Sequence, residues 1–194
     1  MEPSLLSGIF KQIVTGVITV GSMFYSTIDG VHANFGGVDV HSDGKQVLVT
    51  TYLENCFTDD FDRLFSSGKR IYFHYRIDII DAADNSIVQS KELFNAISYS
   101  HLDNIYEVYR SYQETLTSNL QIRRAKFLLA SLPDVPVLSL EYLDGEKIYL
   151  VKISAWLDRI KLEGMEEPLN LMFYWNSIRP EIISRPFTLD ALNL

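Results

Sequence analysis

The sequence contains a single cysteine, Cys56, so no disulfide can form within the chain. Cys56 stands between Asn55 and Phe57 at the end of a strand-like run, where a small apolar residue is expected to be buried. A nucleophilic cysteine would need a nearby histidine and a helix N-terminus, and the sequence shows neither arrangement. We therefore expect Cys56 to be structural, and the cysteine count leaves reducing and oxidising compartments open.

Positive charge is also scarce. The 194 residues include 17 Lys and Arg against 25 Asp and Glu, which gives a formal net charge of −8. A surface with this balance repels the phosphate backbone of nucleic acids and the anionic headgroups of a bilayer. The one small basic cluster, Arg123, Arg124 and Lys126, falls in a predicted amphipathic helix, where it is typical of a solvated face. We therefore expect no nucleic-acid partner.

Motifs that carry well-known chemistries are missing from the chain. There is no G-x-S-x-G elbow, no P-loop and no dinucleotide-binding fingerprint. Glu166 and Glu167 are adjacent in the chain, so they cannot face each other as the acid pair of a glycosidase. No histidine lies at metal-ligand spacing from another; the four are His32, His41, His74 and His101. These absences predict a protein that is not an enzyme, with no cofactor, no metal site and no catalytic residues.

Long hydrophobic runs are lacking too, because no stretch has the roughly 20 dominantly apolar residues of a spanning helix. Residues 1–10 also lack the basic start of a secretory signal. Residues 9–28 are nevertheless mostly apolar, small or hydroxylated, and their first apolar pairs recur every four residues, which favours one face of a helix. Valine, isoleucine and threonine, with Gly16 and Gly21, keep a strand open as an alternative, and an inserted anchor is a third. The candidate interaction residues of this segment are Ile9, Phe10, Ile13, Val14, Val17, Ile18, Phe24 and Tyr25.

The pattern changes to short strands and turns near residue 31. We therefore divide the chain into an N-terminal amphipathic helix or anchor segment, residues 1–30, and a single β-rich domain, residues 31–194. The amphipathic pattern suits peripheral membrane contact through residues 5–28.

A short helix is expected soon after the first strands. Thr58 predicts its N-cap, and Gly68 predicts the C′ position that follows its last turn. Three aspartates fall in the first turn, where the helix dipole favours negative charge, and their spacing does not fit a calcium-binding loop; they are Asp59, Asp60 and Asp62. The apolar face expected to be buried consists of Phe61, Leu64 and Phe65.

Alternation of apolar and polar residues is the main pattern in the β-rich part of the sequence. The strongest hairpin signal is Asp43-Gly44, since the tight turns of hairpins need positive φ. Predicted strands cover residues 38–41, 46–53, 70–80, 87–100, 106–117, 138–143, 147–162 and 169–178. A second helix is expected over residues 119–132, ended by Pro133 and Pro136, and the tail after Pro180 is expected to be non-helical. The fold class is therefore mainly β, an antiparallel β-sandwich or open barrel of about seven or eight strands with two short α-helices.

Aromatic residues are plentiful, with 11 tyrosines, 11 phenylalanines and two tryptophans. A side chain that buries a ring and keeps a polar tip suits an interface. We select Tyr99, Tyr106 and Trp175 as candidate interaction residues on this ground. The alternative is that the same rings pack the core of the sandwich.

Several patterns after residue 38 follow one another in a characteristic order. A long strand follows a short helix and Ser67-Gly68, and the run Ile97-Ser98-Tyr99-Ser100-His101-Leu102 precedes Tyr106-x-Val108. A helix with Ala125, Leu128 and Leu132 is followed by Tyr149-x-Val151-x-Ile153, Leu157-Asp158 and Pro168-Leu169 before Trp175. In this order the chain resembles a bacterial family of domains of unknown function, family 4390. The resemblance implies an exported, membrane-tethered protein facing the cell envelope, and it implies no activity and no catalytic residue.

Two functions of different class follow from these expectations. The first is a non-enzymatic, envelope-associated or periplasmic scaffold that binds a protein partner or forms a homo-oligomer through a strand edge or an aromatic face, as part of a membrane-linked assembly. The second is a β-sandwich carrier of a small ligand or lipid. An exposed apolar surface favours the first and an apolar cavity between the sheets favours the second. The location rests on the resemblance, and the sequence leaves the cytoplasm open.

Overall fold

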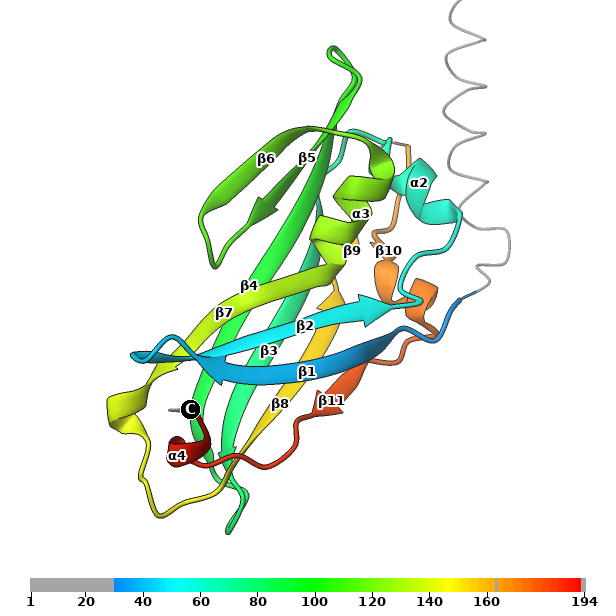
Figure 1. The fold of residues 1–194 in the computed structure, drawn as a ribbon. Coiled ribbons are helices and arrows are strands. Elements are labelled where there is room, and N and C mark those ends of the chain that lie inside the picture. Colours follow the sequence, from blue (N-terminus) through cyan, green and yellow to red (C-terminus); the bar gives the residue numbers. More distant parts are fainter. Residues whose placement is uncertain (1–29, 163, 193–194) are drawn as a thin grey trace, which may run out of the picture.

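The computed structural model describes residues 30–162 and 164–192, and the chain is mainly β over this part (Figure 1). Six antiparallel strands form a large sheet in the order β11-β8-β3-β4-β5-β6. Its strands are β3 (Ile71–Asp81), β4 (Ile87–Ser100), β5 (Ile105–Arg110), β6 (Thr115–Leu120), β8 (Tyr149–Leu157) and β11 (Glu181–Ile183). A small sheet contains β1 (Asn34–Ser42), β2 (Gln46–Glu54) and β7 (Ser131–Ser139). The predicted mainly β, sandwich-like class is confirmed.

The central strand β3 shows why these residues form a sheet. Its residues alternate in exposure, and five of them are at most 1% exposed; these are Ile71, Phe73, Tyr75, Ile77 and Ile79. β-branched and aromatic side chains with this period of two suit a strand that is buried on one face. β3 pairs with β4 on one side and with β8 on the other, each over nine residues or more. The buried side of these strands is the inner face of the large sheet.

The small sheet and the helices cover that inner face (Figure 1). The helices are α2 (Asp60–Phe65), α3 (Ile122–Ala130), α4 (Leu189–Leu192) and the two 3₁₀ helices Leu140–Tyr142 and Leu171–Trp175. Helix α2 places Phe61 and Phe65 against Phe73 of β3, with ring centroids 6.0 and 6.5 Å from it. Helix α3 is joined to the same face because Tyr75 Oη donates to Leu129 O at 2.8 Å. The buried side chains of both layers form one continuous core.

The predicted second helix is wrong at its C-terminal end. Helix α3 stops at Ala130, because Ser131 is extended (φ −104°, ψ 142°) and starts β7. Pro133 and Pro136 therefore lie in a strand rather than after a helix. Prolines are tolerated there because β7 is an edge strand of the small sheet, where a missing N–H removes no ladder bond on the open side. The Asn95 amide helps fix this helix-to-strand change, donating to the carbonyls of Leu128, Leu129 and Ser131 at 3.0–3.3 Å.

Three predicted strands are also corrected. In the segment 138–143, β7 ends at Ser139 and a 3₁₀ helix follows. The segment 106–117 is a hairpin rather than one strand, since β5 and β6 are separated by a turn in which Glu114 has φ 51°. The segment 169–178 contains only the short β10 (Leu169–Asn170), paired with β9 (Arg159–Ile160), before a 3₁₀ helix begins. That helix starts where the Asn170 side chain accepts from the Met172 N–H, and it ends at Asn176 with φ 50°. Local capping by asparagine outweighs the strand propensity of the apolar residues between.

The predictions for the first helix and the first turn need smaller corrections. Thr58 is not a side-chain cap, because the first amides of α2 donate to the backbone carbonyls of Thr58 and Asp59. Gly68 lies two residues beyond the C-cap Ser66 and turns the chain toward β3 with φ 76°. The β1–β2 hairpin forms at the predicted place, but only Gly44 has positive φ in its turn, while the Asp43 carboxylate accepts from two following amides. The tail also contains α4, where no helix was expected.

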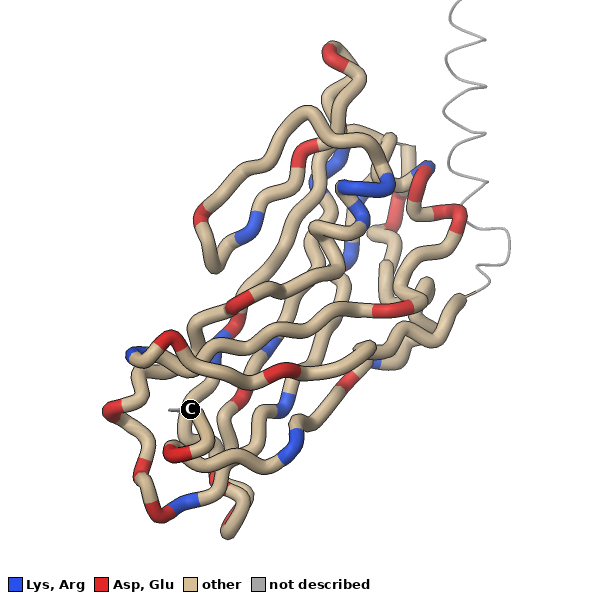
Figure 2. The backbone as a smooth tube through the Cα atoms, in the orientation of Figure 1, with Lys and Arg blue, Asp and Glu red and all other residues tan. Residues whose placement is uncertain are grey.

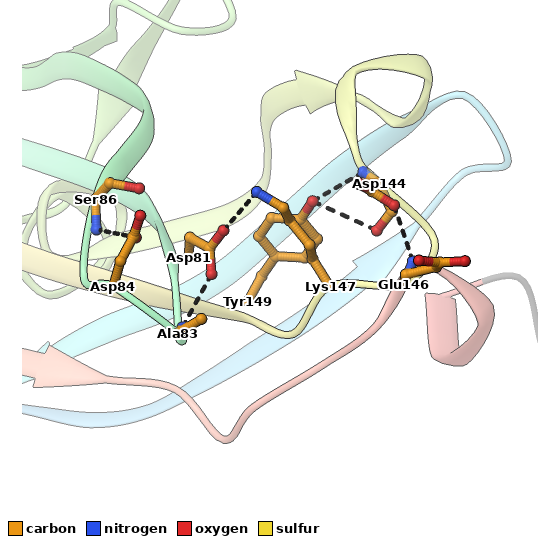
Figure 3. A network of polar contacts seen from close by, with 8 residues as sticks. All are labelled: Asp81, Ala83, Asp84, Ser86, Asp144, Glu146, Lys147 and Tyr149. Carbon is orange, nitrogen blue, oxygen red and sulfur yellow. Dashed lines mark hydrogen bonds and ion pairs between the residues drawn. The ribbon is translucent and has the colours of Figure 1, made fainter.

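The lower end of the large sheet is held by a polar network around Asp81, the last residue of β3 (Figure 3). The Asp81 side chain is only 5% exposed, and its carboxylate accepts from Lys147 Nζ at 2.8 Å and from the Ala83 N–H at 2.9 Å. The Lys147 contact, followed by the amide of Ala83, lowers the pKa of Asp81 below its ordinary value. Asp81 in turn raises the pKa of Lys147. The ion pair therefore ties the β3–β4 turn to the start of β8.

We expect a Lys147→Met variant to be less stable than the parent at neutral pH, because Asp81 would keep its burial and lose its counter-ion. The lowered pKa of Asp81 stabilises the fold above the ordinary Asp pKa of about 3.9, and this contribution disappears as the pH falls through the lower folded pKa. The raised pKa of Lys147 stabilises below about 10.4 and is lost as the pH rises through the folded value. Urea unfolding between these limits should separate the two proteins, and the separation should shrink at about pH 2. An exposed control, Lys161→Met, should unfold like the parent at every pH; equal losses in the two variants would contradict the assignment.

Candidate interaction surface

The outer face of the large sheet is the side opposite the small sheet and the helices. Three of the covering elements directly contact inner-face side chains of β3: α2 and the 3₁₀ helix Leu171–Trp175 pack on Phe73, and α3 binds Tyr75. No helix or second sheet of the described residues packs on the outer face. Directly paired residues of antiparallel strands share a face, so the strand register identifies which side chains lie there.

An aromatic row crosses the outer face near the upper end of the sheet. Trp156 of β8, His74 of β3 and Phe94 of β4 are directly paired neighbours. One step along the strands, Tyr72 of β3 and Tyr109 of β5 flank the small Ala96. Adjacent ring centroids lie 5.3 to 6.0 Å apart, from Trp156 through His74, Tyr72 and Phe94 to Tyr109. We call these five residues the aromatic row; all are partly exposed.

Three rings of the aromatic row are stacked, whereas Phe94 and Tyr109 make edge-on or tilted contacts. Trp156 and His74 are stacked with an interplanar angle of 11°, and Tyr72 stacks on the other side of His74 at 23°. The Arg179 guanidinium lies 5.1 Å from the centre of the Trp156 ring. His74 Nε2 is held by Asp158 Oδ2 at 2.7 Å, which fixes the orientation of the ring. A partner would therefore meet the edges of the Trp156 and His74 rings rather than their faces.

Below the aromatic row lie a charged belt and an apolar row. The belt holds paired ions: Arg76 Nε bonds Asp78 at 2.9 Å, and Lys152 Nζ bonds Glu181 at 2.9 Å. Glu92, opposite Arg76 in the same belt, is held less closely, because its carboxylate is 3.9 Å from the guanidinium and 65% exposed. The lower apolar row consists of the directly paired Leu150, Ile80 and Ile87, together with the exposed Ile148 and Ile183. The outer face combines apolar side chains with neutralised polar ones, as protein interfaces do.

The three aromatic residues selected from the sequence do not lie together in the structure. Trp175 is fully buried in the core, where its Nε1–H donates to Cys56 O at 2.9 Å, so it offers no surface to a partner in this conformation. Tyr99 and Tyr106 are half-buried neighbours with ring centroids 4.7 Å apart. Tyr106 Oη lies 3.0 Å from Ser66 Oγ at the end of α2, so this pair packs on the helix side of the sheet.

The remaining selected residues lie outside the described part of the chain; they are Ile9, Phe10, Ile13, Val14, Val17, Ile18, Phe24 and Tyr25. The structure therefore does not test the interaction role or the secondary structure of residues 1–28. The residues of the aromatic row were not selected from the sequence. The signal was nevertheless present, because the polar, outward positions of β3 and β8 contain rings only near one end. Recognising that these rings meet requires the strand register.

Cys56, the single thiol of the chain, has a structural role. Burial raises the pKa of the Cys56 thiol to about 12, which keeps it protonated and unsuited to nucleophilic attack at neutral pH. No three His, Cys, Asp or Glu residues of the described ranges gather as metal ligands. No described helix is long and apolar enough to cross a bilayer.

The basic cluster of α3 is also partly engaged. Figure 2 shows basic positions gathered at α3 and acidic positions spread over turns at both ends of the molecule. Lys126 Nζ contacts Asp62 Oδ1 of α2 at 2.5 Å, and the Arg124 guanidinium lies 4.9 Å from the Phe127 ring centre. These contacts tie the cluster to the protein itself, in keeping with a solvated helix face.

Comparison with known proteins is consistent with the resemblance seen in the sequence. No curated protein and no solved structure matches the chain. One family model matches residues 32–176, from just before β1 to just after the 3₁₀ helix that contains Trp175. The match covers most of the chain, including the small sheet and every strand of the large sheet except β11, so the protein belongs to the family described as "Domain of unknown function (DUF4390)".

Proposed function

We propose that the protein is a non-enzymatic, envelope-associated interaction module whose outer face binds a protein partner or a second copy of the chain. One observation carries this proposal: the outer face of a six-stranded sheet is left uncovered by the described elements, and it bears both the aromatic row and the lower apolar row. Exposed apolar side chains gathered on one face are typical of interaction sites. Aromatic residues are also frequent among the residues that dominate binding energy.

The geometry of the aromatic row favours a protein over a flat small ligand. A sugar or a nucleobase binds by stacking on an open ring face. The faces of Trp156 and His74, at the centre of the stack, are taken by neighbouring rings and by Arg179. In the charged belt, Arg76 and Lys152 are likewise paired with Asp78 and Glu181, so neither cation is free to bind a small anion. A broad, shallow surface of ring edges and neutralised polar groups suits a second protein surface.

The interior favours the same proposal over a lipid or small-ligand carrier. A carrier needs an apolar cavity between its sheets. Here the space is filled by closely spaced rings, and the largest fully buried side chains include Trp175, Tyr75, Tyr149, Tyr174 and Phe61. Envelope association rests on the amphipathic residues 5–28 and on the family resemblance.

Site-specific photocrosslinking in cells tests the proposal. Benzoylphenylalanine placed at Phe94 or Tyr109, on the outer face, should crosslink to one defined protein, and the compartment of that protein reports the location. A Trp156→Ala substitution in the same chain should lower the crosslinking yield about tenfold if the aromatic row dominates the binding energy.

The chain offers matched control positions away from the outer face. Tyr142 and Phe127 are 68% and 57% exposed and lie on the 3₁₀ helix after β7 and on α3. The same crosslinker at these positions should give little product. Equal crosslinking from both sets of positions, or none from the outer face, would refute the proposal. A crosslinked dimer of the chain would identify a second copy as the partner.

A further inference from the structure

The lower half of β4 has a strand partner on one side only. β3 pairs with β4 from Ile87 to Ile97, whereas β5 pairs with it only from Asn95 to Ser100. In Figure 1 the β5–β6 hairpin accordingly flanks only the upper part of β4. No described strand continues β5 alongside residues 87–93. We call this stretch the open β4 edge.

The pairing of β4 with β5 ends at a contact between Phe94 and Ser111. The Ser111 N–H donates to Phe94 O at 3.0 Å, and the Phe94 N–H donates to Ser111 Oγ at 2.8 Å. Alternate residues of an antiparallel strand direct both backbone groups to the same neighbour. Because Phe94 directs its groups toward β5, Glu92 and Ser90 direct theirs into the open β4 edge. Ser90 O accepts a 3.3 Å bond from Gln89 Nε2, and the other three groups have no partner in the described part of the chain.

A hollow of about 450 Å³ adjoins the open β4 edge and gives an added chain room. It is lined by His74, Lys91, Glu92, Leu93, Phe94, Ser111, Tyr112 and Glu114. The Tyr112 hydroxyl is buried there without a hydrogen-bond partner among the described residues. An extended segment placed in this hollow would continue the line of β5.

Opposite charges lie on the two faces of the open β4 edge at consecutive positions. Glu92 is on the outer face opposite Arg76, and its carboxylate is 65% exposed and 3.9 Å from the guanidinium. Lys91 is on the inner face, where its Nζ donates to Pro136 O of β7 and, within the described residues, has no carboxylate partner. An added strand therefore meets a carboxylate on one face and an ammonium group on the other.

We propose that the open β4 edge binds an extended segment of a partner protein by β-strand addition, antiparallel to β4. The segment has a basic residue opposite Glu92, followed directly by an acidic residue opposite Lys91. The backbone groups of Glu92 and Ser90 supply the ladder bonds, and the two charges supply the register. This site lies beside the aromatic row and does not depend on it.

The order of charges favours a partner over a second copy of the chain. In an antiparallel pairing of two copies centred on Ser90, Glu92 would meet Val88, and Lys91 would meet Gln89. Neither charge would then face its opposite. An inward lysine on an edge strand also hinders pairing with apolar strands, so it limits aggregation while leaving the edge open to a matched segment.

Two synthetic peptides of identical composition test the site on the full-length protein. The matched peptide is acetyl-Thr-Arg-Glu-Thr-Thr-Val-Val-Thr-amide, and the control exchanges its Arg and Glu. In an NMR titration up to about 1 mM, the matched peptide should shift and protect the amides of Glu92 and Ser90. The control peptide should bind about fivefold more weakly, because both cross-strand pairs become like-charged.

Two variants of the protein test the charge preference and the backbone contact separately. Glu92→Lys should abolish the preference for the matched peptide, since one charged pair then favours each peptide. Ser90→Pro removes an amide that points into the open edge rather than to β3, so it should keep the fold and lose peptide binding. The proposal is overturned by equal binding of the two peptides to the parent, by no shift at about 1 mM, or by shifts confined to other strands. Concentration-dependent protection of the same amides without peptide would overturn it in favour of a second copy.

Discussion

Replacing Trp175 with alanine is expected to lower the free energy of unfolding by about 4 kcal/mol, as is typical when a large buried aromatic side chain is truncated. The indole is fully buried beside Phe73, with ring centroids 5.7 Å apart, and the variant would leave a cavity there. The Cys56 carbonyl would also lose the donor that now lies 2.9 Å away. Since a domain is commonly stable by only 5–15 kcal/mol, much of the margin would disappear. Urea unfolding followed by circular dichroism measures the difference.

The second tryptophan provides a matched control, because the chain has only two. Trp156 lies in the aromatic row on the outer face, partly exposed, between His74 and Arg179. A Trp156→Ala variant should lose stacking and cation–π contacts worth about 1 kcal/mol together. Each variant keeps one tryptophan, so fluorescence reports unfolding in both. Equal losses would contradict the assignment of one ring to the core and the other to a surface.

An Asn95→Asp substitution is expected to destabilise the protein by about 3 kcal/mol or more at neutral pH. The Asn95 amide is completely buried and donates to the carbonyls of Leu128, Leu129 and Ser131. The new side chain has nearly the same shape but places oxygen against those carbonyls. Burial raises the pKa of the introduced carboxyl, so the loss should be greatest above that raised pKa and shrink as the pH falls through it toward the ordinary Asp value of about 3.9. Thermal or urea unfolding at several pH values shows both effects.

An exposed asparagine provides the comparison for Asn95. Asn85 lies in the β3–β4 turn with φ 60°, a conformation that aspartate also tolerates. Asn85→Asp should change the stability by less than about 0.5 kcal/mol. A loss at Asn95 no larger than at Asn85 would show that the three carbonyls do not depend on the amide.

The sequence predicted those parts of the fold that local pattern controls. The strands over 70–80 and 87–100 and the first hairpin are present within a few residues of their expected bounds. Local pattern is enough there, because the first of these strands alternates and turn residues bound all of them. The end of α3 was mispredicted because helix formers continue to Leu132, and it is a distant residue, Asn95, that fixes the change to a strand. The segment 169–178 was mispredicted because apolar composition alone does not distinguish a strand from a 3₁₀ turn capped by asparagine.

The candidate surface was harder to predict than the fold. Tyr99 and Trp175 were selected as aromatic residues with polar tips, but their exposure depends on which elements cover them. Trp156 and His74 are 82 positions apart, and only the pairing of β3 with β8 makes them neighbours. The open β4 edge is likewise a property of sheet order, since it arises where β5 ends before β4 does. Sequence periodicity indicates the face of a residue but not its neighbours across the sheet.

The order of strands in the large sheet also determines which strands can pair early and which must pair late during synthesis. β3, β4, β5 and β6 follow one another in the chain as a meander of local contacts, which can form early. In the described residues, the other side of β3 is paired by β8, which begins at Tyr149, and the outer edge of β8 is paired by β11, which begins at Glu181, and by Phe187. During synthesis, β3 therefore stays paired along one edge only until the last quarter of the chain has emerged. A chaperone that shields an unpaired strand would be needed most during that interval.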